Sequence, residues 1–415
     1  MNTKNSAEFQ MDFLNRLSFN RFGGTDDEKR AAELIVSEIE ALGGSAEIWE
    51  FPIPGYSISK ATLKVTEPYE EEITVTGIGR SGSTEGEIEA ELFYAEQGEE
   101  ENFKGAKGKI VLINSTPPAV YKRLTASGAV GFLTFSGAYQ DDREKTDLDR
   151  RFLRPRLTDK SGKLPGLCMR TEDAIILMHK GAKKVKMELQ GQDEEHISRN
   201  VIAYIKGTEC PEKEFLFTAH YDSTIYGLGS WDNASGSANI LELYRYYLNN
   251  PPRHSMRFIW CGSEEQGLLG SRAYVNANEE LMDKIILCQN FDMTGTEIGR
   301  HRLLITANEE LKFFVKFLSK EVGFITRVDE DIHSSDSTPF AHKGVPAIGY
   351  MRDGQAGGHS RFDIPWPLSA QRLAEATDFA VKVTNRLDQA AELPFKREIS
   401  KPIAEKLENY VNPKD

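Results

Sequence analysis

The chain has 415 residues, a formal net charge of −13 and a hydrophobic content of 39%. This length predicts two or three domains, with enough buried core that no disulfide bond is needed. The acidic balance argues against nucleic-acid binding, and no run is apolar for long enough to cross a membrane. The N-terminus lacks the apolar core of a secretory signal, and the four cysteines have no paired spacing. We therefore expect a soluble, cytoplasmic protein.

An amphipathic helix over residues 25–42 is the first element that the sequence predicts. Thr25 and Glu28 have the spacing of a capping box, and two glycines, Gly43 and Gly44, follow as a stop signal. A strand over residues 46–51 is expected next.

The pattern changes between residues 56 and 192, where short β-like runs alternate with glycine turns. We interpret this region as a β-rich domain that is inserted into another domain. The surrounding domain then consists of residues 1–55 and 193–400, and residues 401–415 form a C-terminal tail.

Strands and helices alternate from residue 200 onward. The predicted strands cover 200–205, 215–219, 256–260, 285–290, 303–306 and 347–351, and the predicted helices 234–248, 267–277, 308–322 and 369–388. This alternation predicts an α/β fold whose mixed, mostly parallel central sheet is sandwiched by helices. Ligands of such folds bind at the carboxyl ends of the strands.

Residues that can bind a metal ion end two of these strands. His220 and Asp222 close the strand EFLFTAH, and because they are two residues apart, Asp222 can hydrogen-bond the imidazole of His220. Asp292 ends another strand, where a carboxylate is costly unless it is paired or metal-bound. A single histidine at a strand end is usually structural, but the further ligand candidates favour a metal site here.

Further candidates precede a helix or lie in a loop. Asp232 either caps the helix that follows or bridges two metal ions, and Asn233 can take the capping role and leave Asp232 free to bridge. His359 lies in the glycine-rich segment GGHSRFD. His333 and His342 are rival imidazoles that we rank below His359.

Glu264 and Glu265 stand side by side after the apolar strand MRFIWC. One of them can bind metal while its neighbour takes a proton from the activated water, which contributes roughly 10²–10⁴-fold in rate. Two imidazoles and several carboxylates are ligands that zinc accepts, and cobalt or manganese would fit the same set. We therefore predict two divalent metal ions, with zinc favoured.

Seven motifs make the chain similar to the di-zinc aminopeptidase family that includes bacterial leucyl aminopeptidases and yeast aminopeptidase Y. They are NVIAYIKGT, AHYDS, DNASGSANILE, GSEEQGLLGS, NFDM, SDSTPFAHKGVPAIGY and GGHSRFD. The resemblance implies that one zinc ion is held by His220 and Asp292 and the other by Glu265 and His359, with Asp232 bridging them. Through GKIVLI, the stretch over residues 121–132 that ends in GAVGF, and LPGLCM, the inserted region resembles a protease-associated domain.

The resemblance also implies that Glu264 is the catalytic base and that Asp222 positions His220. One departure concerns the oxyanion: the family's Tyr-His-Thr reads Gly-His-Ser around His359, so the tyrosine expected to stabilise the oxyanion is missing. Tyr350 is a candidate replacement.

The predicted function is a metal-dependent exopeptidase, in the first place an aminopeptidase that hydrolyses N-terminal residues from peptides. Trp231 either shapes the substrate pocket or fills the core. A carboxypeptidase or dipeptidase on the same scaffold would need a basic pocket, for which Arg352 and Arg361 are candidates. A glutaminyl cyclase usually keeps one zinc ion, and a receptor-like relative should have lost ligands. The expected partner is a peptide, with a homodimer left open.

Overall fold

The computed structural model describes residues 3–140, 142, 148 and 151–412. Two compact units result: a larger unit of Met1–Ile53 with Ile197–Asp415, and an inserted unit of Pro54–His196. Two long strands, β1 (Ala46–Glu67) and β8 (Lys184–Ile205), run from one unit into the other. The described helices include none that is both long and apolar enough to span a membrane.

The larger unit is built on a mixed sheet. Its strand order is β13 (Thr326–Glu330), β12 (Gly299–Thr306), β14 (Ala347–Gly354), β11 (Ile285–Phe291), β9 (Cys210–His220), β10 (His254–Cys261) and β8. The β12–β13, β11–β14, β9–β11 and β9–β10 pairs are parallel, and the β12–β14 and β8–β10 pairs are antiparallel. The predicted α/β fold with a mostly parallel central sheet is therefore confirmed.

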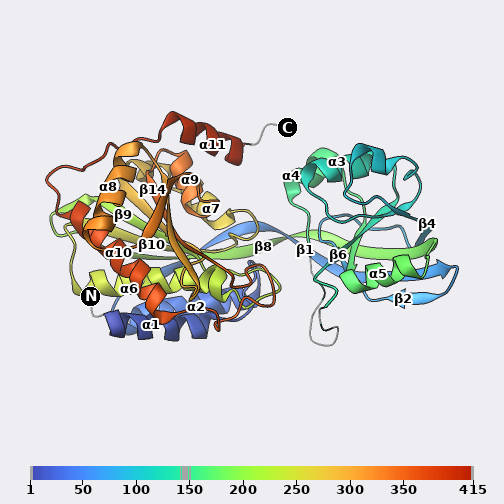
Figure 1. Ribbon diagram of the computed structural model, residues 1–415, viewed down its shortest axis with the longest axis horizontal. Helices are drawn as coiled ribbons and strands as arrows, with labels where there is room; N and C mark the ends of the chain where they lie inside the picture. Colours follow the sequence, from blue (N-terminus) through green and yellow to red (C-terminus); the bar gives the residue numbers. More distant parts are fainter. Residues whose placement is uncertain (1–2, 141, 143–147, 149–150, 413–415) are drawn as a thin grey trace. The chain divides into compact units, whose positions relative to one another are not determined.

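Helices cover both faces of this sheet (Figure 1). One face contacts α1 (Thr3–Leu17), α2 (Asp26–Ala41), α6 (Ser235–Asn249), α8 (Glu309–Glu321) and α10 (Ala370–Asp388). The other face contacts α7 (Leu269–Ala277), η3 (Glu279–Lys284) and α9 (Ser337–His342). Successive residues of each strand point to opposite faces of the sheet, so apolar side chains pack against both helix layers. Phe217 and Phe258 lie on the same face, and their ring centroids are 5.0 Å apart. Burying each such side chain contributes roughly 1.5–3 kcal/mol.

The N-terminus of α2 differs in one respect from the predicted capping box. Thr25 Oγ1 accepts a hydrogen bond from Glu28 N at 3.2 Å, as expected of an N-cap. The Glu28 carboxylate instead accepts from Gly24 N and from Ser198 Oγ. Burial raises the pKa of Glu28 to about 7. Glu28 therefore links α2 to β8 and does not close the box on its own N-cap.

The helices that were not predicted from the sequence include α1 and α11 (Lys401–Val411). In α1, Phe13, Leu14 and Leu17 are fully buried in the main core. In α11, Ile403 and Leu407 pack with Ala341 of α9. Both helices are stabilised by contacts with distant segments, which a local pattern does not reveal. Residues 413–415 of the predicted C-terminal tail lie outside the described residues.

The inserted unit has its own sheet and two hydrophobic clusters. The strand order is β8, β4 (Ile88–Tyr94), β5 (Ile110–Leu112), β6 (Gly131–Ser136), β7 (Gly166–Arg170) and β3 (Thr76–Gly77). Strand β1 forms a hairpin with β2 (Glu71–Ile73). The remaining elements are η1 (Glu100–Phe103), α3 (Pro118–Ala126), α4 (Pro155–Ser161) and α5 (Thr171–His179).

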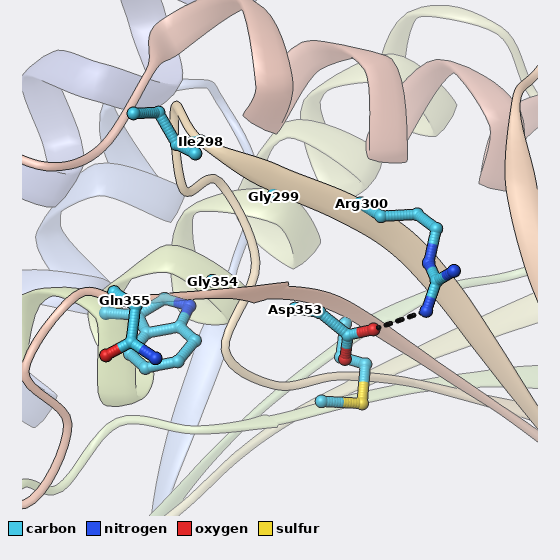
Figure 2. A pocket seen from close by; sticks show the side chains of 8 residues that line it. Ile298, Gly299, Arg300, Asp353, Gly354 and Gln355 are labelled. Atoms are coloured by element: carbon cyan, nitrogen blue, oxygen red, sulfur yellow. Dashed lines mark hydrogen bonds and ion pairs between the residues drawn. The ribbon is translucent and has the colours of Figure 1, made fainter.

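An open pocket of about 800 Å³ lies beside β12 and β14 in the larger unit (Figure 2). Arg300 and Asp353 form an ion pair on its wall, with 3.3 Å between Nη2 and Oδ2. The pocket is lined by Trp231, Ile298, Gly299, Arg300, Met351, Asp353, Gly354 and Gln355. Trp231 directly precedes Asp232, so the pocket adjoins the segment that carries a predicted metal ligand.

Candidate metal centre

Neighbouring strands carry the candidate ligands to one edge of the sheet. His220 is the last residue of β9, Glu265 lies in the turn after β10, and Asp292 directly follows β11. Because β9 is parallel to both β10 and β11, the carboxyl ends of the three strands meet at this edge. Asp232 comes from η2 (Ser230–Ala234), which leads into α6.

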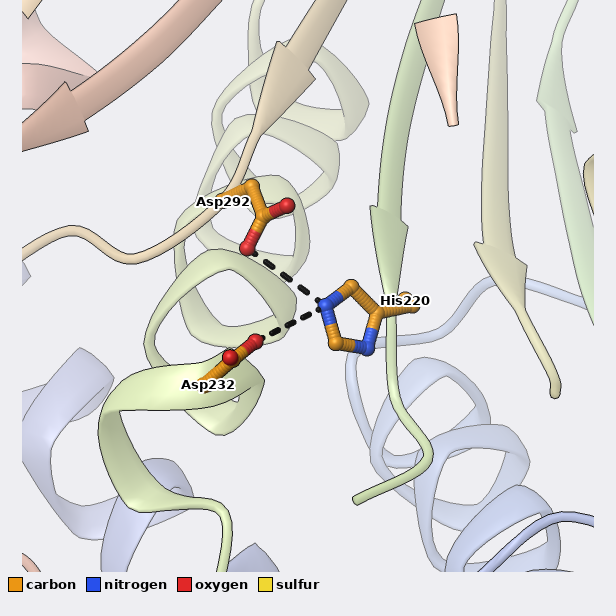
Figure 3. Close-up of side chains that lie close together, drawn as sticks. All are labelled: His220, Asp232 and Asp292. Atoms are coloured by element: carbon orange, nitrogen blue, oxygen red, sulfur yellow. Dashed lines mark ion pairs between the residues drawn. The ribbon is translucent and has the colours of Figure 1, made fainter. Parts of the chain in front are cut away.

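The side chains form two groups of three that share Asp232. In the first group, His220 Nε2 lies 3.1 Å from Asp232 Oδ1 and 3.4 Å from Asp292 Oδ1 (Figure 3). In the second group, His359 Nε2 lies 3.0 Å from Asp232 Oδ2 and 3.1 Å from Glu265 Oε2. Each oxygen of Asp232 thus faces a different imidazole.

These spacings fit two metal ions. Two ligand atoms about 2.0–2.1 Å from a tetrahedral zinc ion lie roughly 3.3–3.4 Å apart, close to the separations within both groups. Asp292 Oδ1 and Glu265 Oε1 are buried and have no hydrogen-bond partner among the described residues. Buried carboxylate oxygens are costly unless something satisfies them, and a divalent cation does so. The donor set also suits zinc.

The segment around Asp232 is held by other residues. Asn233 Oδ1 accepts from Gly236 N at 2.8 Å at the start of α6, and so supplies the capping interaction. Asp363 accepts from the backbone N–H groups of Trp231 and Asp232 at 2.6 and 3.1 Å. Asp232 therefore does not cap α6, and its side chain points toward the imidazoles of His220 and His359.

Asp222 connects the histidine of β9 to the glutamate pair. Its Oδ1 lies 3.5 Å from His220 Nδ1, and its backbone oxygen lies 3.3 Å from the same nitrogen. The two carboxylate oxygens accept from Glu264 N and Glu265 N at 3.0 and 3.3 Å. Asp222 is fully buried, so it fixes the turn that presents the two glutamates.

Glu264 belongs to neither group of three. Burial raises its pKa well above 4.5, with further contributions from the nearby charges of Asp336 and Asp292. Burial and the charge of Asp232 raise the pKa of Glu265 to about 7. A carboxylate that lies beside a metal-binding group and holds a proton readily is suited to act as a base near neutral pH.

Two of the predicted substrate-binding residues lie away from the cluster. Tyr350 is 1% exposed, its ring stacks on Phe291, and its hydroxyl donates to Gln289 Oε1 at 2.7 Å. Arg352 is also buried, and it donates to the carbonyl oxygens of Thr296 and Glu297. Both suggestions are corrected: Tyr350 does not reach the cluster, and Arg352 is engaged with backbone.

Trp231, the third substrate-binding candidate, and the rival imidazoles of His333 and His342 each lie in a different environment. Trp231 is buried, yet it lines the open pocket. His342 lies on α9 and pairs with Glu408 of α11 at 2.9 Å, so it takes no part in the cluster. His333 is buried beside β14, close enough for the charges of Asp292 and Asp232 to affect its pKa.

Arg21, Asp336 and Asp363 were missed as site residues by the sequence analysis. Arg21 is fully buried and donates to four backbone oxygens, those of Phe19, Tyr221, Leu228 and Gly229. Asp336 is fully buried, and its charge acts on Glu264. Asp336 and Asp363 both lie inside the quoted motifs SDSTPF and GGHSRFD, which was the available signal.

Imidazoles and carboxylates gathered at the carboxyl ends of the strands of an α/β sheet are the arrangement expected of a metallohydrolase. Residues 200–384 match the model of peptidase family M28. The resemblance stated from the motifs is thereby confirmed.

The similar proteins include aminopeptidases. Aminopeptidase YwaD of Bacillus subtilis (strain 168) is 26% identical over 378 residues, which cover 86% of this chain and 79% of the relative. Leucine aminopeptidase 2 of Trichophyton rubrum is 35% identical over 126 residues, which cover 30% of this chain and 25% of the relative. The structure of BSAP, a zinc aminopeptidase from Bacillus subtilis, aligns with a TM-score of 0.79 at 24% identity, covering 96% of this chain and 98% of BSAP.

Proposed function

We propose that the protein is a zinc-dependent aminopeptidase with two metal ions, which removes N-terminal residues from peptides. One observation carries the proposal: the two oxygens of Asp232 each face a separate imidazole–carboxylate group, while Glu264 stands beside them outside both groups. The M28 match and the aminopeptidase relatives support the same reaction class. His220 and Asp292 would hold one ion, Glu265 and His359 the other, and Asp232 would bridge them.

When bound, the two ions would lower the pKa of a shared water and polarise the scissile carbonyl. Glu264 takes the proton from the attacking water and delivers it to the nitrogen of the leaving amine as the C–N bond breaks. Asp222 keeps Glu264 and Glu265 in place through their backbone N–H groups. Arg21 and Asp363 hold in place the backbone that leads up to Asp232.

The carboxypeptidase alternative has less support. A carboxypeptidase needs a free cation to bind the C-terminal carboxylate of its substrate. Arg352 is buried, and its Nε and Nη2 donate to the carbonyl oxygens of Thr296 and Glu297, which leaves Arg361 as the remaining candidate cation. We therefore retain the aminopeptidase as the proposed function.

The inserted unit is proposed to be a protease-associated-like module. Its central strands β4, β5, β6 and β7 are parallel and carry the segments GKIVLI and GAVGF on which the resemblance rested. Deletion of residues 56–192 with a short glycine linker should leave zinc binding by the larger unit intact. Loss of zinc together with that module would contradict an independent accessory role.

Zinc binding is expected to release protons. In the metal-free protein, hydrogen bonds to Asp232 and Glu265 raise the pKa of His359 to about 11, so this imidazole is protonated at pH 7. Zinc binds only the neutral ring, and the displaced proton makes apparent affinity increase with pH through the neutral range. Calorimetric titration in two buffers of different ionisation enthalpy measures the release. A binding heat that is the same in both buffers would contradict the prediction.

The function is tested by digesting a peptide pool with the zinc-loaded protein and reading the products by mass spectrometry. The pool contains each peptide with a free or acetylated N-terminus and a free or amidated C-terminus. We expect residues to be lost one at a time from peptides with a free N-terminus only, whether their C-terminus is free or amidated. If peptides are shortened only when their C-terminus is free, the protein is a carboxypeptidase and the proposal is wrong. Chelator-treated protein is the control.

A further inference from the structure

His333 is a buried imidazole that the proposed mechanism does not use. It lies in the loop between β13 and α9, is 9% exposed, and has no hydrogen-bond partner for its buried Nδ1 among the described residues. The ring lies against β14, where a Cβ atom added to Gly349 would come within 2.9 Å of Nδ1. The glycine therefore makes room for the ring, and Nε2 is the nitrogen farther from this backbone.

The alternation of the strands places His333 on the same face as the first metal group. On β9, Thr218 and His220 share this face; on β11 and directly after it, Asn290 and Asp292 share it. Gly349 pairs with Asn290 in the sheet, and Asn290 is two residues before Asp292 on the same face.

Hydrogen bonds fix the His333 loop to this face. Thr218 Oγ1 donates to Asn290 Oδ1 at 2.7 Å, and Asn290 Nδ2 donates to Ser335 Oγ at 2.9 Å. The backbone oxygen of His333 accepts from Ser335 N and from Thr338 Oγ1. These bonds tie the backbone of the loop to the face of the sheet that carries His220 and Asp292.

The surroundings keep this imidazole neutral. Burial lowers the pKa of His333 below 6.5, although the charges of Asp292 and Asp232 act in the opposite direction. A proton on Nδ1 would be a buried donor without an acceptor, which costs roughly 1–3 kcal/mol. The proton therefore resides on Nε2, and the ring offers one N–H donor.

We propose that His333 is a further catalytic residue, whose Nε2–H donates a hydrogen bond to the carbonyl oxygen of the scissile peptide bond as that oxygen gains negative charge. The inference rests on the proposed function. His333 keeps its proton throughout, because the proton of water passes to Glu264 and then to the leaving amine. One such donor typically contributes about 10²–10³-fold to kcat.

Substitution of His333 tests the proposal. His333→Leu removes the donor, and His333→Gln keeps an amide N–H of similar reach. With a leucine amide substrate, we expect kcat of the Leu variant to fall about 10²–10³-fold, with KM changed by a few-fold at most. The Gln variant should retain more of kcat. His301→Gln is the matched control, since His301 is also buried but pairs with Glu375, and its substitution should leave kcat unchanged.

Two further measurements separate a catalytic role from a structural one. Zinc content and melting temperature should be the same in the variants as in the wild type. The affinity for a leucine phosphonic acid, which mimics the tetrahedral oxyanion, should fall by about the factor seen in kcat/KM. If the wild type is active and His333→Leu is equally active, this inference is overturned but the proposed function is not. The same holds if the His333→Leu variant has lost its zinc. A zinc-loaded wild type that releases no leucine overturns the proposed function as well.

Discussion

Replacing Glu264 by glutamine should reduce kcat by roughly 10²–10⁴-fold while the protein keeps all of its zinc. Glu264 lies outside both ligand groups, so its loss removes the base and no metal ligand. Its backbone N–H still donates to Asp222, and glutamine has the same shape as the protonated carboxyl that burial already favours. The fold should therefore be unchanged. Steady-state kinetics and zinc analysis of the same sample provide the test.

Glu265→Gln is the matched control for this experiment. Glu265 faces His359 at 3.1 Å within the second group, so its substitution should lower zinc content. If Glu264→Gln loses zinc and Glu265→Gln keeps it, the roles of the two neighbouring glutamates are exchanged. Full activity of Glu264→Gln would exclude Glu264 as the base.

Replacing Asp232 by alanine should weaken the binding of both metal ions together. Asp232 is the one residue common to the two groups, with one oxygen toward each imidazole. Loss of an outer partner of a metal ligand typically costs 10–100-fold in affinity, and loss of a bridging ligand should cost at least about 10²-fold at each ion. Zinc titration with a competing chelator measures both affinities.

Asp292→Ala provides the comparison. Asp292 belongs only to the group of His220, so this variant should lose one ion more readily than the other. The same single-ion loss in Asp232→Ala would contradict the bridging assignment. Equal retention of both ions would show that Asp232 is not a ligand.

The ligand candidates could be predicted because their signals are local. His220, Glu265 and Asp292 each end or follow an apolar strand, and strands that alternate with helices bring their carboxyl ends to one edge. Asp232 was harder, because an aspartate before a helix is usually a cap. Asn233 takes that role here, which only the three-dimensional arrangement shows.

The residues around the centre could not be predicted, for reasons of strand geometry and distance. Tyr350 is close to His359 in sequence, yet Gly349 lies on the face of the sheet that carries Asn290 and Asp292, so Tyr350 points to the opposite face. Arg21 is about 200 positions from three of the backbone oxygens that it binds, those of Tyr221, Leu228 and Gly229, and nothing in its local sequence indicates them. His333 could be identified as a rival imidazole, but its position against Gly349 depends on the fold.

The most direct test of the two-metal aminopeptidase is a kinetic titration of the metal-free protein with zinc. Leucine release from a peptide with a free N-terminus is followed as zinc is added in known ratios to the chain. The arrangement of two ligand groups around Asp232 predicts that activity rises until two zinc ions are bound per chain and then remains constant. Full activity at one zinc ion per chain, or no leucine release at any ratio, would contradict the account.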